Sequence, residues 1–154
     1  MELETKHFGI LKYTAEFVYD FDEGLPGFGD LKKFILISDG EPNGLFYWLQ
    51  SMEDGEVAFA LMDVYQVKPD YNPLVEPELL QDLGDFSDNT LNIYNVCVVP
   101  DEIAQMRVHL KAPVVINMQT RKGKQVICNN EEYGIRHLIF EEMEEWKHKE
   151  ARAE

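Results

Sequence analysis

The fold is decided by the stretch Leu110-Lys-Ala-Pro-Val-Val-Ile-Asn117, followed by Thr120-Arg-Lys-Gly-Lys-Gln125 and Tyr133-Gly-Ile-Arg-His137. Two strand-like runs, from Val114 to Met118 and from Gln125 to Cys128, flank the basic segment Arg121–Lys124. This order predicts a β-hairpin with a basic tip, in which Gly123 is free to take a positive φ. We favour a solvated hairpin tip for the basic segment, and contact with an acidic protein segment is the second interpretation.

Further strand signals lie upstream of this hairpin. Leu45–Leu49 and Val57–Met62 flank turn-forming residues at Met52–Gly55, which predicts another hairpin. Glu16–Phe21 alternates, so that its three aromatic residues share one face. The alternation from Met106 to Leu110 is typical of a strand with one wet face. The chain is therefore rich in short strands.

Helical signals are confined to two segments. Glu76–Gly84 has a proline near its start and ends in glycine, and the segment from about Leu138 to Ala153 carries apolar residues at i, i+4 and i+7. We predict a mainly β, single-domain, antiparallel β-barrel-like fold with one short helix and a C-terminal helix. Residues 1–140 would form the barrel domain and residues 141–154 a helical extension.

Composition limits the classes of function. The chain has 154 residues, 45% of them apolar, and a formal net charge of −15. Phosphate binding needs clustered Lys and Arg, so this charge argues against direct binding to nucleic acid, and it also disfavours anionic membranes. An acidic protein can be steered toward a basic partner, although solubility alone explains the charge more simply. Met1–Lys6 lacks an apolar core, which predicts that this segment is not a secretory signal.

Residues suited to catalysis or metal binding are scattered. The four histidines have no metal-ligand partner at helical or hairpin spacing, and no acid–base pair stands out among the carboxylates. Cys97 and Cys128 lie in apolar runs, which favours buried thiols over a disulfide in an exported protein. We therefore predict no enzyme activity, no cofactor and no metal.

Candidate binding residues come from strand alternation, loop placement and polar motifs. Alternation sets Tyr47 apart from Phe46 and Trp48, while the turn-rich segment 64–73 offers exposed tyrosines. Polar residues of the 110–137 stretch are further candidates, although each could instead satisfy backbone groups at strand ends. The predicted partner-binding residues are Tyr47, Gln50, Tyr65, Tyr71, Asn117, Gln125 and Arg136.

Eight short motifs, taken in order, resemble one bacterial family. They are Thr5-Lys-His-Phe-Gly9, Glu23-Gly-Leu-Pro-Gly-Phe28, Phe46-Tyr-Trp-Leu-Gln-Ser51, Pro69-Asp-Tyr71, Val98-Val-Pro100, Ala112-Pro-Val-Val-Ile-Asn117, Lys122-Gly-Lys-Gln125 and Arg136-His137. The chain resembles the flagellar assembly factor FliW family from about Thr5 to His137. It departs from the family pattern at Asp22 and in the less aromatic segment Val64–Lys68.

The resemblance implies a cytoplasmic regulator that is not an enzyme. Proteins of this family bind flagellin and also bind CsrA, an RNA-binding repressor of flagellin translation, so that translation follows flagellin export. The implied partners are CsrA and flagellin, with no direct nucleic acid or membrane contact, and the free protein would be a monomer. Two alternatives stay open: a dedicated flagellin chaperone without a translational role, and a small β-barrel ligand-binding domain.

Overall fold

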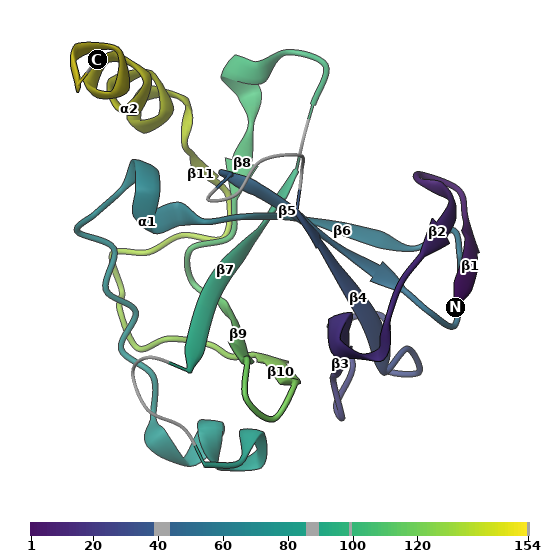
Figure 1. Cartoon of the computed structure of the whole chain (residues 1–154). Coiled ribbons are helices and arrows are strands. Elements are labelled where there is room, and N and C mark those ends of the chain that lie inside the picture. Colours follow the sequence, from purple (N-terminus) through teal and green to yellow (C-terminus); the bar gives the residue numbers. More distant parts are fainter. Residues whose placement is uncertain (39–43, 86–89, 99, 154) are drawn as a thin grey trace.

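The computed structural model describes residues 1–38, 44–85, 90–98 and 100–153 (Figure 1). The strands are β1 (Glu2–Thr5), β2 (Gly9–Lys12), β3 (Val18–Asp20), β4 (Lys33–Ser38), β5 (Phe46–Ser51), β6 (Ala58–Met62), β7 (Leu91–Val98), β8 (Arg107–Val108), β9 (Val114–Asn117), β10 (Lys122–Gln125) and β11 (His137–Leu138). The helices are η1 (Ala15–Phe17), α1 (Val64–Val67), η2 (Pro77–Leu83), η3 (Ile103–Gln105) and α2 (Phe140–Ala153), with η marking 3₁₀ helices.

Seven of the described strands close into a barrel, which confirms the predicted mainly β, barrel-like class. Neighbours follow the order β7-β6-β5-β4-β3-β10-β9, and β9 returns to β7 with Tyr94 opposite Val114. The neighbours are antiparallel except at the β3–β10 seam, where Asp20 pairs with Lys122 in parallel. Strand β8 pairs with the C-terminal end of β7, and β11 pairs with β8. Strands β1 and β2 form a separate hairpin.

The two predicted hairpins are present as β5–β6 and β9–β10, but the basic segment is placed differently. Lys122–Gln125 is the return strand itself, and the turn residue with positive φ is Arg121 at 59°. The prediction that Gly123 takes a positive φ is wrong, because Gly123 lies inside β10. Glycine is needed there for space: an added Cβ would lie 2.7 Å from Phe21 Cε1.

The sequence predicted the presence of these elements better than it predicted their ends and their helix type. The run Glu16–Phe21 is a strand only over Val18–Asp20, and Phe17, which lies in η1 before the strand, is 47% exposed while Tyr19 and Phe21 are buried. The predicted helix at Glu76–Gly84 is the 3₁₀ helix η2, and α1 is a single helical turn inside the segment expected to be a loop. The C-terminal helix begins at Phe140, two residues after the start that the apolar spacing predicted.

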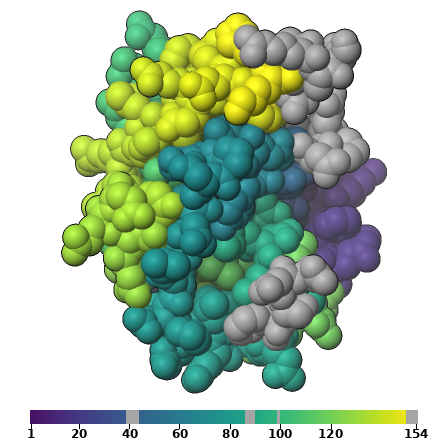
Figure 2. Space-filling model, turned by 90° about the vertical axis from the view of Figure 1, so that its left-hand side faces the viewer, coloured from purple at the N-terminus to yellow at the C-terminus, as the bar shows by residue number. Residues whose placement is uncertain are grey.

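The core divides between the barrel interior and its outer wall. Tyr19, Phe34, Leu49, Leu61 and Val114 are among the side chains that fill the interior. A second cluster covers the outside of β6 and β7, where Met143 of α2 packs with residues of α1 and β8. Figure 2 shows α2, in yellow, resting on the teal surface that includes α1. Helix η2 covers a third, smaller cluster on β9.

Both cysteines are buried free thiols, which confirms the favoured interpretation over a disulfide. Burial raises the pKa of the Cys97 thiol to about 12, so Cys97 is protonated and unreactive near neutral pH. No helix in the described ranges is long and apolar enough to cross a membrane.

Candidate functional site

A groove of about 530 Å³ opens at the end of the barrel where β5 begins, β6 ends and β7 begins. Its lining residues are Tyr47, Asp63, Tyr65, Leu91, Asn92, Ile93 and Tyr94. Two of the sequence-predicted binding residues, Tyr47 and Tyr65, therefore share one surface. This groove is the candidate site.

Strand register places the groove residues. Tyr47 pairs with Leu61, so the start of β5 lies beside the end of β6. Asp63 follows directly after β6. The backbone N–H of Asp63 donates to Leu45 O at 2.9 Å, and Gln66 Nε2 donates to Asp63 Oδ2 at 3.1 Å. Asp63 is thus held at the start of α1, the single helical turn that presents Tyr65 with 37% of its surface exposed.

The tyrosine rings that line the groove are held in position by packing on neighbouring rings. Tyr47 packs on Tyr94 with ring centroids 4.8 Å apart, and Asn92 Nδ2 donates to Tyr94 Oη at 3.3 Å. Tyr65 packs on the buried ring of Tyr71 at 5.6 Å. Tyr47 points toward the barrel interior while Phe46 and Trp48 pack on the outer cluster, as strand alternation predicted. The walls are therefore set before any partner binds.

One carboxylate influences all three tyrosines of the groove. Burial is the main cause that raises the pKa of Tyr47, Tyr65 and Tyr94, and the negative charge of Asp63 raises each pKa further. The pKa of Tyr94 reaches about 12. The three hydroxyls stay protonated at physiological pH, so the groove offers O–H donors and aromatic faces, with Asp63 as the one acidic side chain among its described lining residues. Tyrosine rings with a free face and a hydroxyl are enriched on surfaces that bind proteins.

Comparison with known proteins agrees with the fold. Residues 2–139 match the family described as FliW protein. The chain belongs to the FliW family. The flagellar assembly factor FliW of Thermoanaerobacter pseudethanolicus is 43% identical over 143 residues, covering 93% of this chain and 95% of that protein. The flagellar assembly factor FliW of Caldanaerobacter subterraneus subsp. tengcongensis is 42% identical over 143 residues, with the same coverage. A crystal structure of the flagellar assembly factor FliW superposes with a TM-score of 0.81 at 28% identity, covering 90% of this chain and 96% of that one.

Two residues predicted to lie on the surface of this FliW-family protein are buried, so that placement is wrong. Gln50 has no exposed surface, and its Nε2 lies 3.0 Å from Ser51 O and 3.1 Å from Val57 O, which ties the β5–β6 turn together. Tyr71 is 2% exposed and donates from its hydroxyl to Leu110 O at 2.6 Å. Both side chains support the fold beneath the surface.

The predicted residues of the 110–137 stretch lie outside the groove lining. Asn117 has no exposed surface and donates to Leu83 O and Asp85 O, both at 3.0 Å, which confirms the alternative that it satisfies backbone groups. Gln125 is half-buried and donates to Ala112 O at 3.0 Å. Arg136 is exposed.

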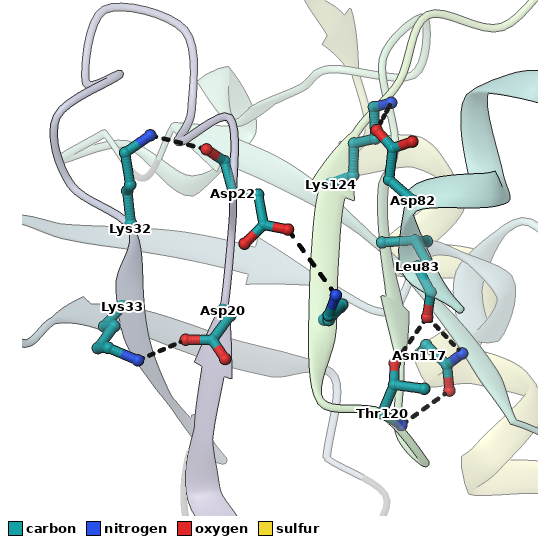
Figure 3. A network of polar contacts seen from close by, with 10 residues as sticks. Asp20, Asp22, Lys32, Lys33, Asp82, Leu83, Asn117, Thr120 and Lys124 are labelled. Carbon is teal, nitrogen blue, oxygen red and sulfur yellow. Dashed lines mark hydrogen bonds and ion pairs between the residues drawn. The ribbon is translucent and has the colours of Figure 1, made fainter. Parts of the chain in front are cut away.

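The basic segment is paired within the molecule. Lys124 lies 3.1 Å from Asp82 and 3.6 Å from Glu23, and only 12% of its side chain is exposed. A solvated hairpin tip is therefore wrong for Lys124. Figure 3 shows the Lys124–Asp82 ion pair and the Asn117 hydrogen bonds beside the β3–β10 seam. Short backbone pairing at this seam is thus reinforced by side chains.

Asp63, Asn92 and Tyr94 are groove residues that sequence reasoning missed. Tyr94 lies within a strand-like run, and Asp63 follows Met62 directly at the end of another. Their only sequence signal is position: Asp63 directly follows one strand, and Asn92 and Tyr94 lie near the start of the next. Which strand ends meet is a property of the barrel, and no local pattern reports it.

Proposed function

We propose that this protein is a non-enzymatic, cytoplasmic flagellar assembly factor that binds flagellin and antagonises the translational repressor CsrA. Flagellin accumulating before export would occupy the protein and leave CsrA free to repress translation. Export of flagellin would release the protein to capture CsrA. The observation that carries the proposal is the tyrosine-lined groove on an acidic member of the FliW family.

The charge of the chain supports an encounter with CsrA. The sequence holds 29 Asp and Glu residues against 14 Lys and Arg residues. An RNA-binding protein is basic, so complementary fields accelerate association and suppress wrong partners. Antagonism by competition requires only that flagellin and CsrA exclude one another, through a shared site or coupled states. No catalytic step is needed.

Tyr47 and Tyr65 are the proposed direct contacts. Tyrosine is enriched among the residues that dominate binding energy, because a large rigid ring contributes contact area at low entropic cost. Gln125 and Arg136 are proposed contacts on a second part of the surface, since both retain exposed area. Gln50, Tyr71 and Asn117 would affect binding only by holding the fold in place.

The test is calorimetry of the purified protein with CsrA and with flagellin from the same organism. We expect micromolar or tighter binding of each, and we expect one partner to displace the other. Tyr65→Ala should weaken binding about tenfold, within the range of an interface aromatic. Ile10→Ala is the matched control, because Ile10 is 68% exposed on β2 and lies outside the groove lining. Absence of binding to both proteins would contradict the proposal.

A deletion strain separates this function from that of a dedicated flagellin chaperone. Loss of the regulator should lower flagellin synthesis, because CsrA would then repress without opposition. Unchanged flagellin synthesis together with insoluble flagellin would instead favour the chaperone. Ribosome occupancy of flagellin mRNA and flagellin solubility are the two measurements.

A further inference from the structure

We propose that the groove receives an arginine side chain of a basic protein partner, which lies against the Tyr47 and Tyr65 rings and pairs with the Asp63 carboxylate. The inference rests on the proposed function, since it names the partner group that this surface recognises. It follows from three properties of the groove: an available carboxylate, positioned aromatic rings and an acidic surrounding chain.

The carboxylate of Asp63 has capacity for a cation. Its Oδ2 accepts a hydrogen bond from Gln66 Nε2, which orients the group. Within the described parts of the chain Asp63 makes no ion pair, whereas Asp20, Asp22, Glu23 and Asp82 are each paired with a lysine. A carboxylate has about four lone-pair positions, so one amide hydrogen bond leaves room for a bidentate donor. Among the described residues that line the groove, Asp63 is therefore the one negative charge, and it stands beside aromatic rings.

Two accessible aromatic rings line the same groove as the Asp63 carboxylate. Tyr47 and Tyr65 both line the groove with Asp63, and each is backed by another ring, Tyr94 at 4.8 Å and Tyr71 at 5.6 Å. A cation within about 6 Å of a ring centroid is attracted by the negative face of the ring. Rings already held by a neighbouring ring lose little conformational entropy when a ligand packs on them.

Arginine fits this combination better than lysine. Its guanidinium is planar, stacks on aromatic faces, forms two parallel hydrogen bonds to a carboxylate and is less strongly hydrated than an ammonium. A groove of about 530 Å³ is larger than one side chain needs, so the backbone that carries the arginine can enter with it. The net charge of −15 brings a basic partner toward the groove.

The first experiment needs no partner protein. The protein is titrated with N-acetyl-arginine amide, its neutral analogue N-acetyl-citrulline amide and N-acetyl-lysine amide, while tyrosine ring NMR signals are followed. We expect saturable shifts of the Tyr47 and Tyr65 signals with the arginine compound and at least tenfold weaker responses with the other two. Asp63→Asn should abolish the difference between arginine and citrulline while keeping an oxygen for Gln66. Equal responses to the three compounds, or none, would overturn the inference.

The second experiment separates failure of the inference from failure of the proposed function. Binding of wild type, Asp63→Asn and Tyr65→Leu to CsrA and to flagellin is measured by calorimetry. We expect each variant to weaken binding of at least one protein tenfold or more, with circular dichroism unchanged. Wild-type binding that both variants retain in full would overturn the arginine site and leave the function standing. Binding of the arginine compound without binding of either protein would overturn the function alone.

Discussion

Tyr71 and Asn95 hydrogen-bond to each other inside the protein: Asn95 Nδ2 donates to Tyr71 Oη at 2.9 Å, and Tyr71 in turn donates to Leu110 O. Asn95 also donates to His109 O at 3.0 Å, and it has no exposed surface. Burial holds the pKa of Tyr71 above its usual range. This chain of bonds ties the segment after α1 to β7 and to the loop before β9.

Removal of the Tyr71 hydroxyl should destabilise the fold. Tyr71→Phe leaves Leu110 O without this donor, and an unsatisfied buried group costs about 1–3 kcal/mol. Tyr71→Ala also empties a core site, for which the cost is about 3–5 kcal/mol. Tyr65→Phe is the control, because Tyr65 is 37% exposed, and it should change the free energy of unfolding by less than about 0.5 kcal/mol. Urea denaturation gives all three values, and equal costs for the two phenylalanine variants would contradict the assignment.

Gly123→Ala should strain the barrel seam. The new methyl group would overlap the Phe21 ring, and overpacking of this kind costs about 1–3 kcal/mol. Gly29→Ala is a matched control, because no atom lies within 4 Å of its added Cβ. The double variant Phe21→Leu/Gly123→Ala should show a favourable coupling energy in a thermodynamic cycle. Additive costs would mean that the two sites do not meet.

Loss of the Asn117 side chain should loosen the attachment of η2. Asn117 Nδ2 donates to Leu83 O at the end of η2, while its Oδ1 accepts from Gln119 N at 3.0 Å. Asn117→Ala should cost about 2–4 kcal/mol, since several partners lose their bonds together. Asn129→Ala, which removes one exposed bond to Glu76, should cost less than about 1 kcal/mol. Hydrogen exchange of the amides in η2 should quicken only in the first variant.

Protonation of His109 should destabilise the protein in mild acid. Ala112 N donates to His109 Nδ1 at 3.2 Å, which requires a neutral ring, and burial lowers the pKa of His109. Because the folded pKa lies below the unfolded value of about 6.5, the unfolded state binds more protons as the pH falls. This contribution is complete above about pH 6.5 and is lost as the pH falls through the folded pKa. His109→Asn, whose Oδ1 can still accept, should flatten the pH dependence of the free energy of unfolding between pH 7 and 5.

Sequence patterns predicted the elements better than they predicted exposure. The β5–β6 hairpin and α2 follow from apolar periodicity and turn residues within one segment. Gln50 and Tyr71 were expected outside because they are polar and lie near turns, yet both are buried with hydrogen-bond partners. A polar side chain needs a hydrogen-bond partner, and for Gln50 and Tyr71 the structure supplies backbone carbonyl groups of this chain.

Sequence patterns were enough to predict a mainly β, acidic protein of the FliW family that contains the β5–β6 and β9–β10 hairpins and a terminal helix. Tertiary structure alone decided that Tyr47, Asp63, Tyr65 and Tyr94 line one groove. The difference arises from the distance along the chain over which each kind of interaction acts. Alternation and turn chemistry act between neighbours in the chain, whereas the groove depends on how β5, β6 and β7 register and on where the closed barrel brings their ends together.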